Sequence, residues 1–156
     1  MIKLIAIDAD GTLLNSESAI SGQNRQTISR CIQQGIKVVF ITGKNLNAAK
    51  RIINTFRPPN PQVVSNGTLI VDQGLNHLDY RLINSGSVKS IIEFARKTGQ
   101  LLFLSTLDGD LVYEQGLSEV VHKHYMRKVD DLMDPDIAGQ VLLATILKRE
   151  ESGPID

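Results

Sequence analysis

Two acidic residues near the start of the chain, Asp8 and Asp10, directly follow an apolar run and precede Gly11-Thr12. Residues i and i+2 of an extended strand point to the same side, so the two carboxylates should lie close together and repel each other. A divalent cation would relieve this repulsion, and so would protonation of one carboxyl, which could then act as an acid. Mg²⁺ suits carboxylate, carbonyl, water and phosphate oxygens. A carboxylate can also act as a nucleophile, since aspartyl phosphate is a known covalent intermediate.

Small polar residues and a glycine follow each of three apolar segments. The segments are residues 2–7, 37–41 and 62–65, and the residues after them are Asp8-Ala9-Asp10-Gly11-Thr12, Thr42-Gly43-Lys44 and Asn66-Gly67. Ligands of open α/β sheets bind at the carboxyl ends of the strands, so we expect these residues to meet at one sheet edge. There Thr42 would offer a hydroxyl, Gly43 a close backbone approach to a phosphoryl oxygen, and Lys44 a positive charge.

The elements that would position these residues alternate between strand and helix. The run at residues 2–7 is typical of a buried parallel strand. A helix is predicted from a Ser21 cap to about Gln34, with Gly35 at its end, and another up to about Phe56. A helix between two apolar strands forms a βαβ unit, so residues 1–67 are predicted to be βαβαβ.

The pattern changes after residue 67 and predicts an α+β module over residues 68–147. The expected elements are a hairpin of 68–72 and 77–83, a helix at 87–98, a strand pair of 101–106 and 111–114 around Asp108-Gly109, a helix at 118–128, an acidic loop at 129–136 and a strand at 141–147. A polar tail, residues 148–156, follows. Asp130, Asp131, Asp134 and Asp136 are interpreted as a solvated loop rather than a metal site.

Composition narrows the classes of protein. The 156 residues are 42% hydrophobic, which is typical of a globular chain. Seventeen basic and 17 acidic residues balance, so no charge excess indicates nucleic acid or an anionic membrane as a partner. Cys31 is the single cysteine, no apolar run reaches the length of a membrane span, and no secretion signal is evident. We therefore expect a soluble, cytoplasmic protein.

Two alternative motifs fail on specific positions. A calcium-binding loop that began at Asp8 would need glutamate at its twelfth position, where Ala19 stands. A phosphate-binding P-loop at Gly43-Lys44 would need a glycine five residues before Gly43 and Ser or Thr after the lysine, but Val38 and Asn45 occupy those places.

The three polar strand ends resemble motifs of a known family. Asp8-Ala9-Asp10-Gly11-Thr12 is similar to the first motif of the haloacid dehalogenase superfamily, Ile41-Thr42-Gly43-Lys44 to its second, and Ser65-Asn66-Gly67 to the third strand end of its Cof-type sugar-phosphate phosphatases. The resemblance implies an α/β fold: an incomplete Rossmann-like core of three parallel strands with helices (1–67), followed by a partial α+β cap (68–147).

The resemblance also implies roles for individual residues. Asp8 would be the nucleophile and would bind Mg²⁺, while Asp10 would protonate the leaving group, then activate water, with its carbonyl on the metal. Thr42 would hold the phosphoryl group. The phosphate pocket would include Gly11, Thr12, Gly43, Lys44, Asn66 and Gly67. Lys44 stands where the family usually has arginine, which keeps the charge but loses the bidentate fork. The implied substrate is a small phosphorylated metabolite of the sugar-phosphate class.

Two later motifs of the family are not found: a lysine, and a Gly-Asp followed by a further Asp. Two functions therefore stay open, a Mg²⁺-dependent phosphomonoester hydrolase and a truncated, catalytically incompetent remnant that binds phosphate or a partner. A receiver domain is rejected, because its phosphorylated Asp would end the third strand, where Ser65 stands. The first strand would also lack a neighbour on one side, and open strand edges invite pairing, so we expect self-association.

Overall fold

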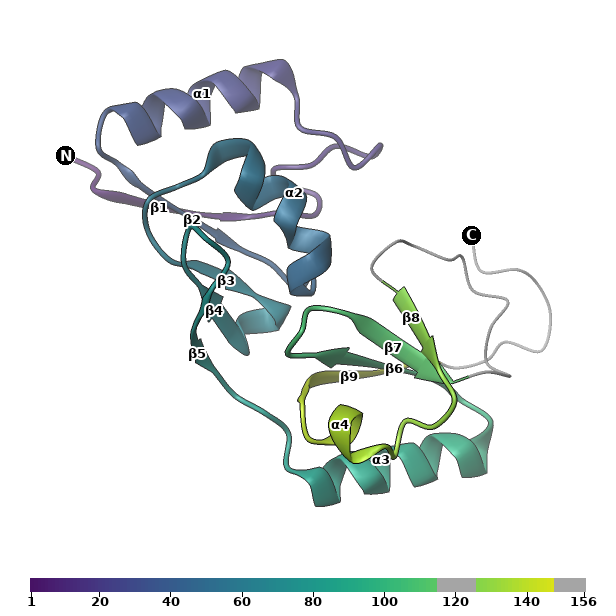
Figure 1. Cartoon of the computed structure of the whole chain (residues 1–156). Helices are drawn as coiled ribbons and strands as arrows, with labels where there is room; N and C mark the ends of the chain where they lie inside the picture. The colour runs from purple at the N-terminus through teal and green to yellow at the C-terminus, as the bar shows by residue number, and fades with distance from the viewer. Residues whose placement is uncertain (115–125, 148–156) are drawn as a thin grey trace. The chain divides into compact units, whose positions relative to one another are not determined.

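The computed structural model describes residues 1–114 and 126–147, which belong to two compact units (Figure 1). The first unit is Met1–Tyr80, and the second begins at Arg81. Each unit is built on its own sheet, of five strands in the first and four in the second. The first unit extends beyond residue 67, where the sequence placed the boundary, because the hairpin that follows residue 67 pairs with the first sheet.

The first sheet has the strand order β1-β2-β3-β4-β5. Its strands are β1 (Leu4–Asp8), β2 (Lys37–Ile41), β3 (Gln62–Val64), β4 (Leu69–Val71) and β5 (His77–Tyr80). The first three are parallel, as predicted, and β4 and β5 continue the sheet in antiparallel fashion. Because β1, β2 and β3 are parallel and are connected by helices, the first unit has an α/β fold.

Two helices, α1 (Gly22–Gln33) and α2 (Leu46–Phe56), connect the parallel strands, as predicted. The Ser21 hydroxyl accepts a hydrogen bond from the Asn24 N–H at 3.1 Å and so caps α1. The Asn45 side chain caps α2 in the same way, with the Ala48 N–H as donor at 2.8 Å. Each helix therefore begins directly after the polar end of the preceding strand or its loop.

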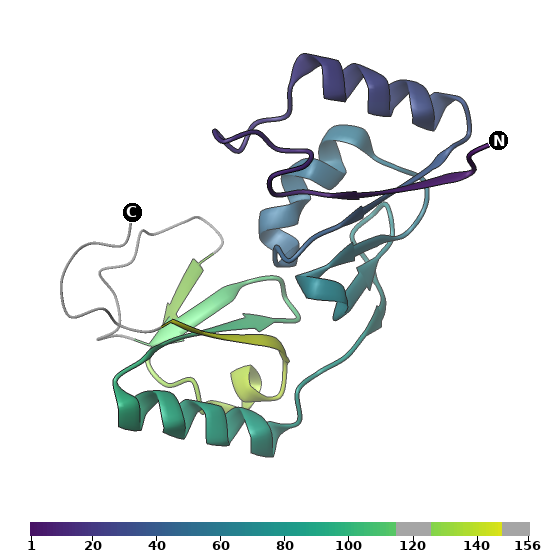
Figure 2. The ribbon, with the colours of Figure 1, turned by 180° about the vertical axis from the view of Figure 1, so that it is seen from behind.

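Within the described residues of the first unit, helices cover one face of the sheet. The side chains of Val38 and Phe40 pack with Ile28 of α1 and with Ile52 and Phe56 of α2 in one cluster, so both helices lie on the same side of the sheet (Figures 1 and 2). On the opposite face the side chains of the parallel strands are exposed or half-buried, which corrects the expectation of a buried first strand. β1 lies at the sheet edge, and its residues alternate between exposed and half-buried.

The second unit packs two helices against its sheet, whose order is β8-β7-β6-β9. Its elements are α3 (Ser85–Thr98), β6 (Leu101–Thr106), β7 (Leu111–Glu114), β8 (Met126–Val129), α4 (Pro135–Ala138) and β9 (Val141–Leu147). Buried Val88 and Ile92 of α3 contact a core that includes Leu102 and Leu104 of β6. The helix at 87–98, the β6–β7 pair and the last strand are confirmed.

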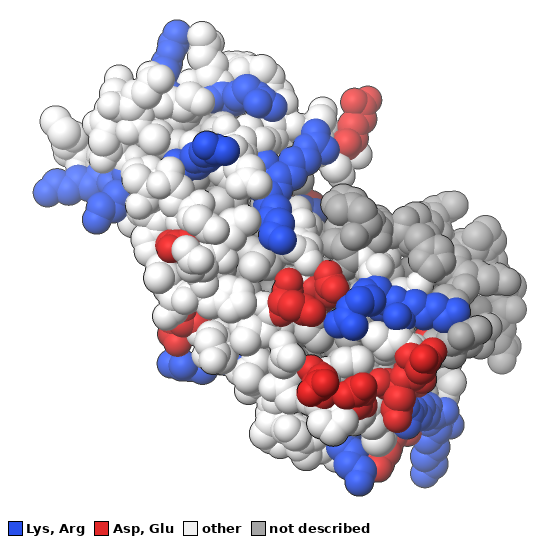
Figure 3. Space-filling model, in the orientation of Figure 1, with Lys and Arg blue, Asp and Glu red and all other residues white. Residues whose placement is uncertain are grey.

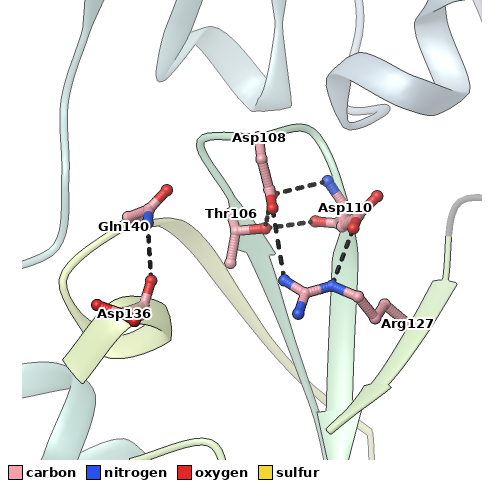
Figure 4. A network of polar contacts seen from close by, with 6 residues as sticks. All are labelled: Thr106, Asp108, Asp110, Arg127, Asp136 and Gln140. Carbon is pink, nitrogen blue, oxygen red and sulfur yellow. Dashed lines mark hydrogen bonds and ion pairs between the residues drawn. The ribbon is translucent and has the colours of Figure 1, made fainter. Parts of the chain in front are cut away.

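The predicted helix at residues 118–128 is wrong where the structure describes it. Residues 118–125 lie outside the described part, and residues 126–128 belong to β8, which pairs in parallel with β7. Figure 4 shows a contact that accompanies this pairing: the Arg127 guanidinium lies 3.0 Å from the Asp110 carboxylate and 3.4 Å from the Asp108 carboxylate. Thr106 donates its hydroxyl hydrogen bond to the same Asp108 carboxylate. The Asp108-Gly109 turn is thus a charged anchor for β8.

The expected acidic loop at 129–136 is more structured than predicted, because Arg96 of α3 binds part of it. Its guanidinium contacts Glu114 at the end of β7 and Asp131 at 2.7 Å. These two carboxylates raise the pKa of Arg96 above its usual range. The Met133 N–H and then Arg96 lower the pKa of Asp131. Asp134, in addition, caps the short helix α4.

Residues 1–114 and 126–147 include no helix that is both long and apolar enough to cross a bilayer. The cytoplasmic location stays a prediction of the sequence.

Candidate active site

The polar ends of β1, β2 and β3 lie next to one another, as the sequence predicted. Asp8, the last residue of β1, is paired in the parallel register with Ile41, the last residue of β2. The Thr42 N–H then donates to the Val63 carbonyl at 3.1 Å, which ties the end of β2 to β3. The backbone therefore brings the three candidate motifs to one edge of the sheet.

Apolar side chains anchor the turn after β1. The Leu13 N–H donates to the Asp8 carbonyl at 3.2 Å, and the Leu14 N–H donates to the Ala9 carbonyl at 2.9 Å. The side chains of Ala9, Leu13 and Leu14 are buried in the core of the first unit. Buried side chains thus fix the turn in the core. Its other residues are exposed to solvent, where a ligand can reach them: Asp8, Asp10, Gly11 and Thr12.

The segment after β2 is held by hydrogen bonds to the turn after β3. Thr42 is only 3% exposed, and its hydroxyl accepts from the Lys44 N–H at 3.2 Å. The Lys44 carbonyl accepts from the Ser65 N–H at 2.8 Å, and the Thr42 carbonyl accepts from the Asn66 N–H at 3.1 Å. Thr42 and Lys44 therefore have fixed backbone positions.

Gly43 and the turn after β3 approach each other closely. A Cβ atom on Gly43 would lie 2.7 Å from Oδ1 of Asn66, so a larger residue would displace that side chain. Ser65 and Asn66 both have left-handed φ angles, 51° and 55°, and Gly67 follows at 89°. Left-handed conformations are strained for residues other than glycine, and such strain often occurs at functional sites.

An ion pair joins the first two motifs. Lys44 Nζ lies 2.8 Å from Oδ1 of Asp10, with side chains 25% and 59% exposed. The sequence indicated that both residues belong to the site, but it could not indicate that they contact each other. The contact means that Asp10 already has a cationic partner before any metal or substrate binds.

Ser65 lies beside the candidate site, and the sequence alone did not predict a role for it. The residue is 1% exposed, and its hydroxyl oxygen has no hydrogen-bond partner within the described residues. The signal was present, since a serine precedes Asn66-Gly67 at the strand end. Ser65 was predicted to end the third strand, whereas β3 ends at Val64 and Ser65 opens a short 3₁₀ turn, Ser65–Gly67.

The donor atoms at this edge fit magnesium. The part of the chain that the structure describes holds no group of three or more His, Cys, Asp or Glu side chains that could bind a metal ion. Asp8 and Asp10 supply two carboxylates, and proteins usually bind Mg²⁺ through one or two carboxylates together with substrate phosphate oxygens. These residues therefore suit Mg²⁺ with a phosphorylated ligand better than a closed structural metal site.

The charge of the first unit also suits an anionic ligand. Lys and Arg outnumber Asp and Glu in residues 1–80, and the reverse holds in the remainder of the chain. Basic side chains predominate over the surface of the first unit in the view of Figure 3. Because the summed charge of a surface raises the local concentration of oppositely charged ligands, the first unit should attract anions.

Known proteins match the chain over most of its length. The family model for haloacid dehalogenase-like hydrolases matches residues 5–147. The 5-amino-6-(5-phospho-D-ribitylamino)uracil phosphatase YcsE of Bacillus subtilis is 31% identical over 142 residues, which are 90% of this chain and 56% of YcsE. The phosphatase YwtE of the same organism, with the same named substrate, is 37% identical over 93 residues, 60% of this chain and 32% of YwtE.

The solved structures agree with this result. A haloacid dehalogenase-like hydrolase from Bacteroides thetaiotaomicron matches with a TM-score of 0.75 and 27% identity, over 86% of this chain and 54% of that protein. The chain thus spans about half the length of YcsE and of this hydrolase. The α/β fold of this chain, with its parallel strands, confirms the predicted fold class. The chain belongs to the haloacid dehalogenase-like hydrolases, as a Cof-type member.

Proposed function

We propose that this chain is a Mg²⁺-dependent phosphatase that hydrolyses a small phosphorylated metabolite, of the sugar-phosphate class, through an aspartyl phosphate on Asp8. The observation that carries the proposal is the convergence of Asp8, Asp10, Thr42 and Lys44 at one sheet edge. Two relatives whose names give a phosphorylated ribitylamino compound as substrate support this substrate class.

The residues divide the reaction between them. A carboxylate oxygen of Asp8 attacks phosphorus as the bond to the leaving oxygen breaks, and Asp10, in its protonated form at this step, gives that oxygen its proton. Water then attacks the phosphorus of the aspartyl phosphate and transfers a proton to Asp10, which releases phosphate and restores Asp8. Thr42, Lys44 and the backbone around Gly43 orient the phosphoryl group. Bound Mg²⁺ would supply positive charge that offsets the negative charge of the phosphoryl group.

The first prediction concerns the purified chain with p-nitrophenyl phosphate, a general aryl phosphate. We expect phosphate release that requires Mg²⁺, ceases with EDTA and returns when Mg²⁺ is restored, because two carboxylates and a dianion need a divalent cation to approach one another. Colorimetric detection of nitrophenolate measures the rate.

A specific alternative is the catalytically incompetent remnant. That function predicts binding of inorganic phosphate, seen as shifts of the Gly43 and Gly67 amide signals by NMR, without any Mg²⁺-dependent turnover. Binding without turnover would therefore overturn the proposed hydrolase and support the remnant.

We also propose that two copies of the chain pair through β1. This strand is an edge of the first sheet and carries the sequence LIAID, whereas the other edge, β5, reads HLDY. Ile2 and Leu4 are 67% and 52% exposed. An edge strand has backbone groups on its outer side that a second copy of the same strand can pair with, and such pairing would cover part of this exposed apolar surface.

The second prediction is that Leu4→Lys converts the proposed dimer into a monomer, because the charged side chain would lie beside apolar side chains of the paired strand and a lysine on an edge strand disfavours pairing. Multi-angle light scattering at high protein concentration gives the mass. Leu78→Lys is a matched control, since Leu78 is 54% exposed but lies on β5. A monomeric wild-type chain, or equal loss of dimer in both variants, would contradict pairing through β1.

A further inference from the structure

The side chain of Lys44 makes an ion pair with Asp10 that neither the sequence nor the family resemblance predicts. Its ammonium lies 2.8 Å from the Asp10 carboxylate. Its N–H donates to the Thr42 hydroxyl, and its carbonyl accepts from Ser65. The backbone of Lys44 is thus fixed by two hydrogen bonds, while its flexible four-carbon side chain alone decides where the positive charge lies.

We propose that Lys44 is a positioning residue that occupies the Asp10 carboxylate in the free protein and moves its charge to the phosphoryl group when substrate binds. The inference rests on the proposed function and deepens it. Lysine suits this exchange because its ammonium is a compact charge on a rotatable stem, whereas arginine would form a bidentate and more rigid pair with a carboxylate. Thr42 lies two residues before Lys44 and is 3% exposed, and it would bind the phosphoryl oxygens next to the Lys44 ammonium.

Two opposite effects on binding follow from this position. An ammonium on Asp10 repels a divalent cation at the Asp8–Asp10 edge, so Lys44 should weaken the binding of Mg²⁺ to the free protein. The same ammonium attracts a phosphate anion, so Lys44 should strengthen the binding of phosphate. A residue that only stabilised the fold would change both affinities in the same direction, or neither.

The third prediction tests this opposition with Lys44→Gln. We expect Mg²⁺ alone to bind about tenfold more tightly than to the wild type, and inorganic phosphate alone to bind about tenfold more weakly, because one unit charge is removed from a partly exposed site. NMR titrations that follow the Gly11 and Gly43 amides measure both dissociation constants. Lys44→Arg keeps the positive charge beside Asp10 and should therefore not tighten the binding of Mg²⁺.

The matched control is Lys37→Gln, which removes the same charge from the start of β2, at the opposite end of that strand. It should change neither constant by more than about twofold, since exposed charges a strand length apart are largely screened by salt. If Lys44→Gln leaves Mg²⁺ affinity unchanged, or lowers both affinities, the inference is wrong.

The failure of this inference can be told from failure of the proposed function. Mg²⁺ binding that requires Asp8, measured in the same titration with Asp8→Asn, but that does not respond to Lys44→Gln, overturns the role of Lys44 only. Mg²⁺ binding that is equal in Asp8→Asn and the wild type overturns the metal site, and with it both proposals.

Discussion

Replacement of Asp8 by asparagine is expected to lower Mg²⁺-dependent phosphate release by about 10³-fold or more, because the amide lacks the nucleophilic charge. The substitution keeps the size of the side chain. Asp8 is exposed at the end of β1, and the hydrogen bond that it receives from Leu13 is made by its backbone carbonyl. The fold of the first unit should therefore persist, and the lost rate should reflect chemistry.

The measurement compares initial rates for p-nitrophenyl phosphate at saturating Mg²⁺. Circular dichroism of the variant confirms that the fold is intact. Glu17→Gln is the matched control, since Glu17 is an exposed acid in the loop that follows the same turn, and it should keep the wild-type rate. Activity of Asp8→Asn within tenfold of the wild type would show that the turnover does not use Asp8.

Much of the first unit was predictable because local features determine it. Apolar runs of about five residues, a Ser21 cap and Gly35 with a left-handed φ of 78° define β1, α1 and β2 without reference to distant residues. The convergence of the three polar segments was predictable for the same reason: parallel strands end at one edge, where Asp8 ends β1 and Thr42 and Ser65 directly follow β2 and β3.

Contacts between residues far apart in sequence account for what was missed. Residues 126–128 have a polar sequence that fits a helix, but Arg127 binds two carboxylates of a distant turn and β7 offers an edge to pair with. The open edge of β1 was predicted, but the exposure of its side chains on one face was not, because an apolar sequence does not indicate whether another element covers it. The pair between Lys44 and Asp10 depends on side-chain directions that motif spacing does not determine.

Gln62 illustrates the same limit in the core of the first unit, where a polar residue is 0% exposed. β2 and β3 are in strand register only at Ile41 and Val63. Earlier along β2, the side chain of Gln62 makes the hydrogen bonds to the backbone of β2 that a paired strand would otherwise make. Its Oε1 accepts from the Phe40 N–H at 2.7 Å, and its Nε2 donates to the Val38 carbonyl at 3.1 Å. A buried glutamine is thus a structural link between strands that both carry site residues.

Gln62→Leu is therefore expected to lower the free energy of unfolding of the first unit by about 2–3 kcal/mol, because the buried Phe40 N–H loses its acceptor. The loss should not be larger, since the Val38 carbonyl keeps a second donor, Asn60 Nδ2 at 2.9 Å. Urea unfolding measures the stability, and amide hydrogen exchange at Phe40 should become faster in the variant.

A matched control separates this effect from the general cost of replacing a glutamine. Gln73→Leu removes one exposed hydrogen bond, from Nε2 to the Arg57 carbonyl at 2.8 Å, and should change the stability by less than about 0.5 kcal/mol. Equal effects of the two substitutions would show that the link is energetically unimportant. Because β2 carries Thr42 and Lys44 at its end, the Gln62 variant should also weaken phosphate binding, while the exposed control should not.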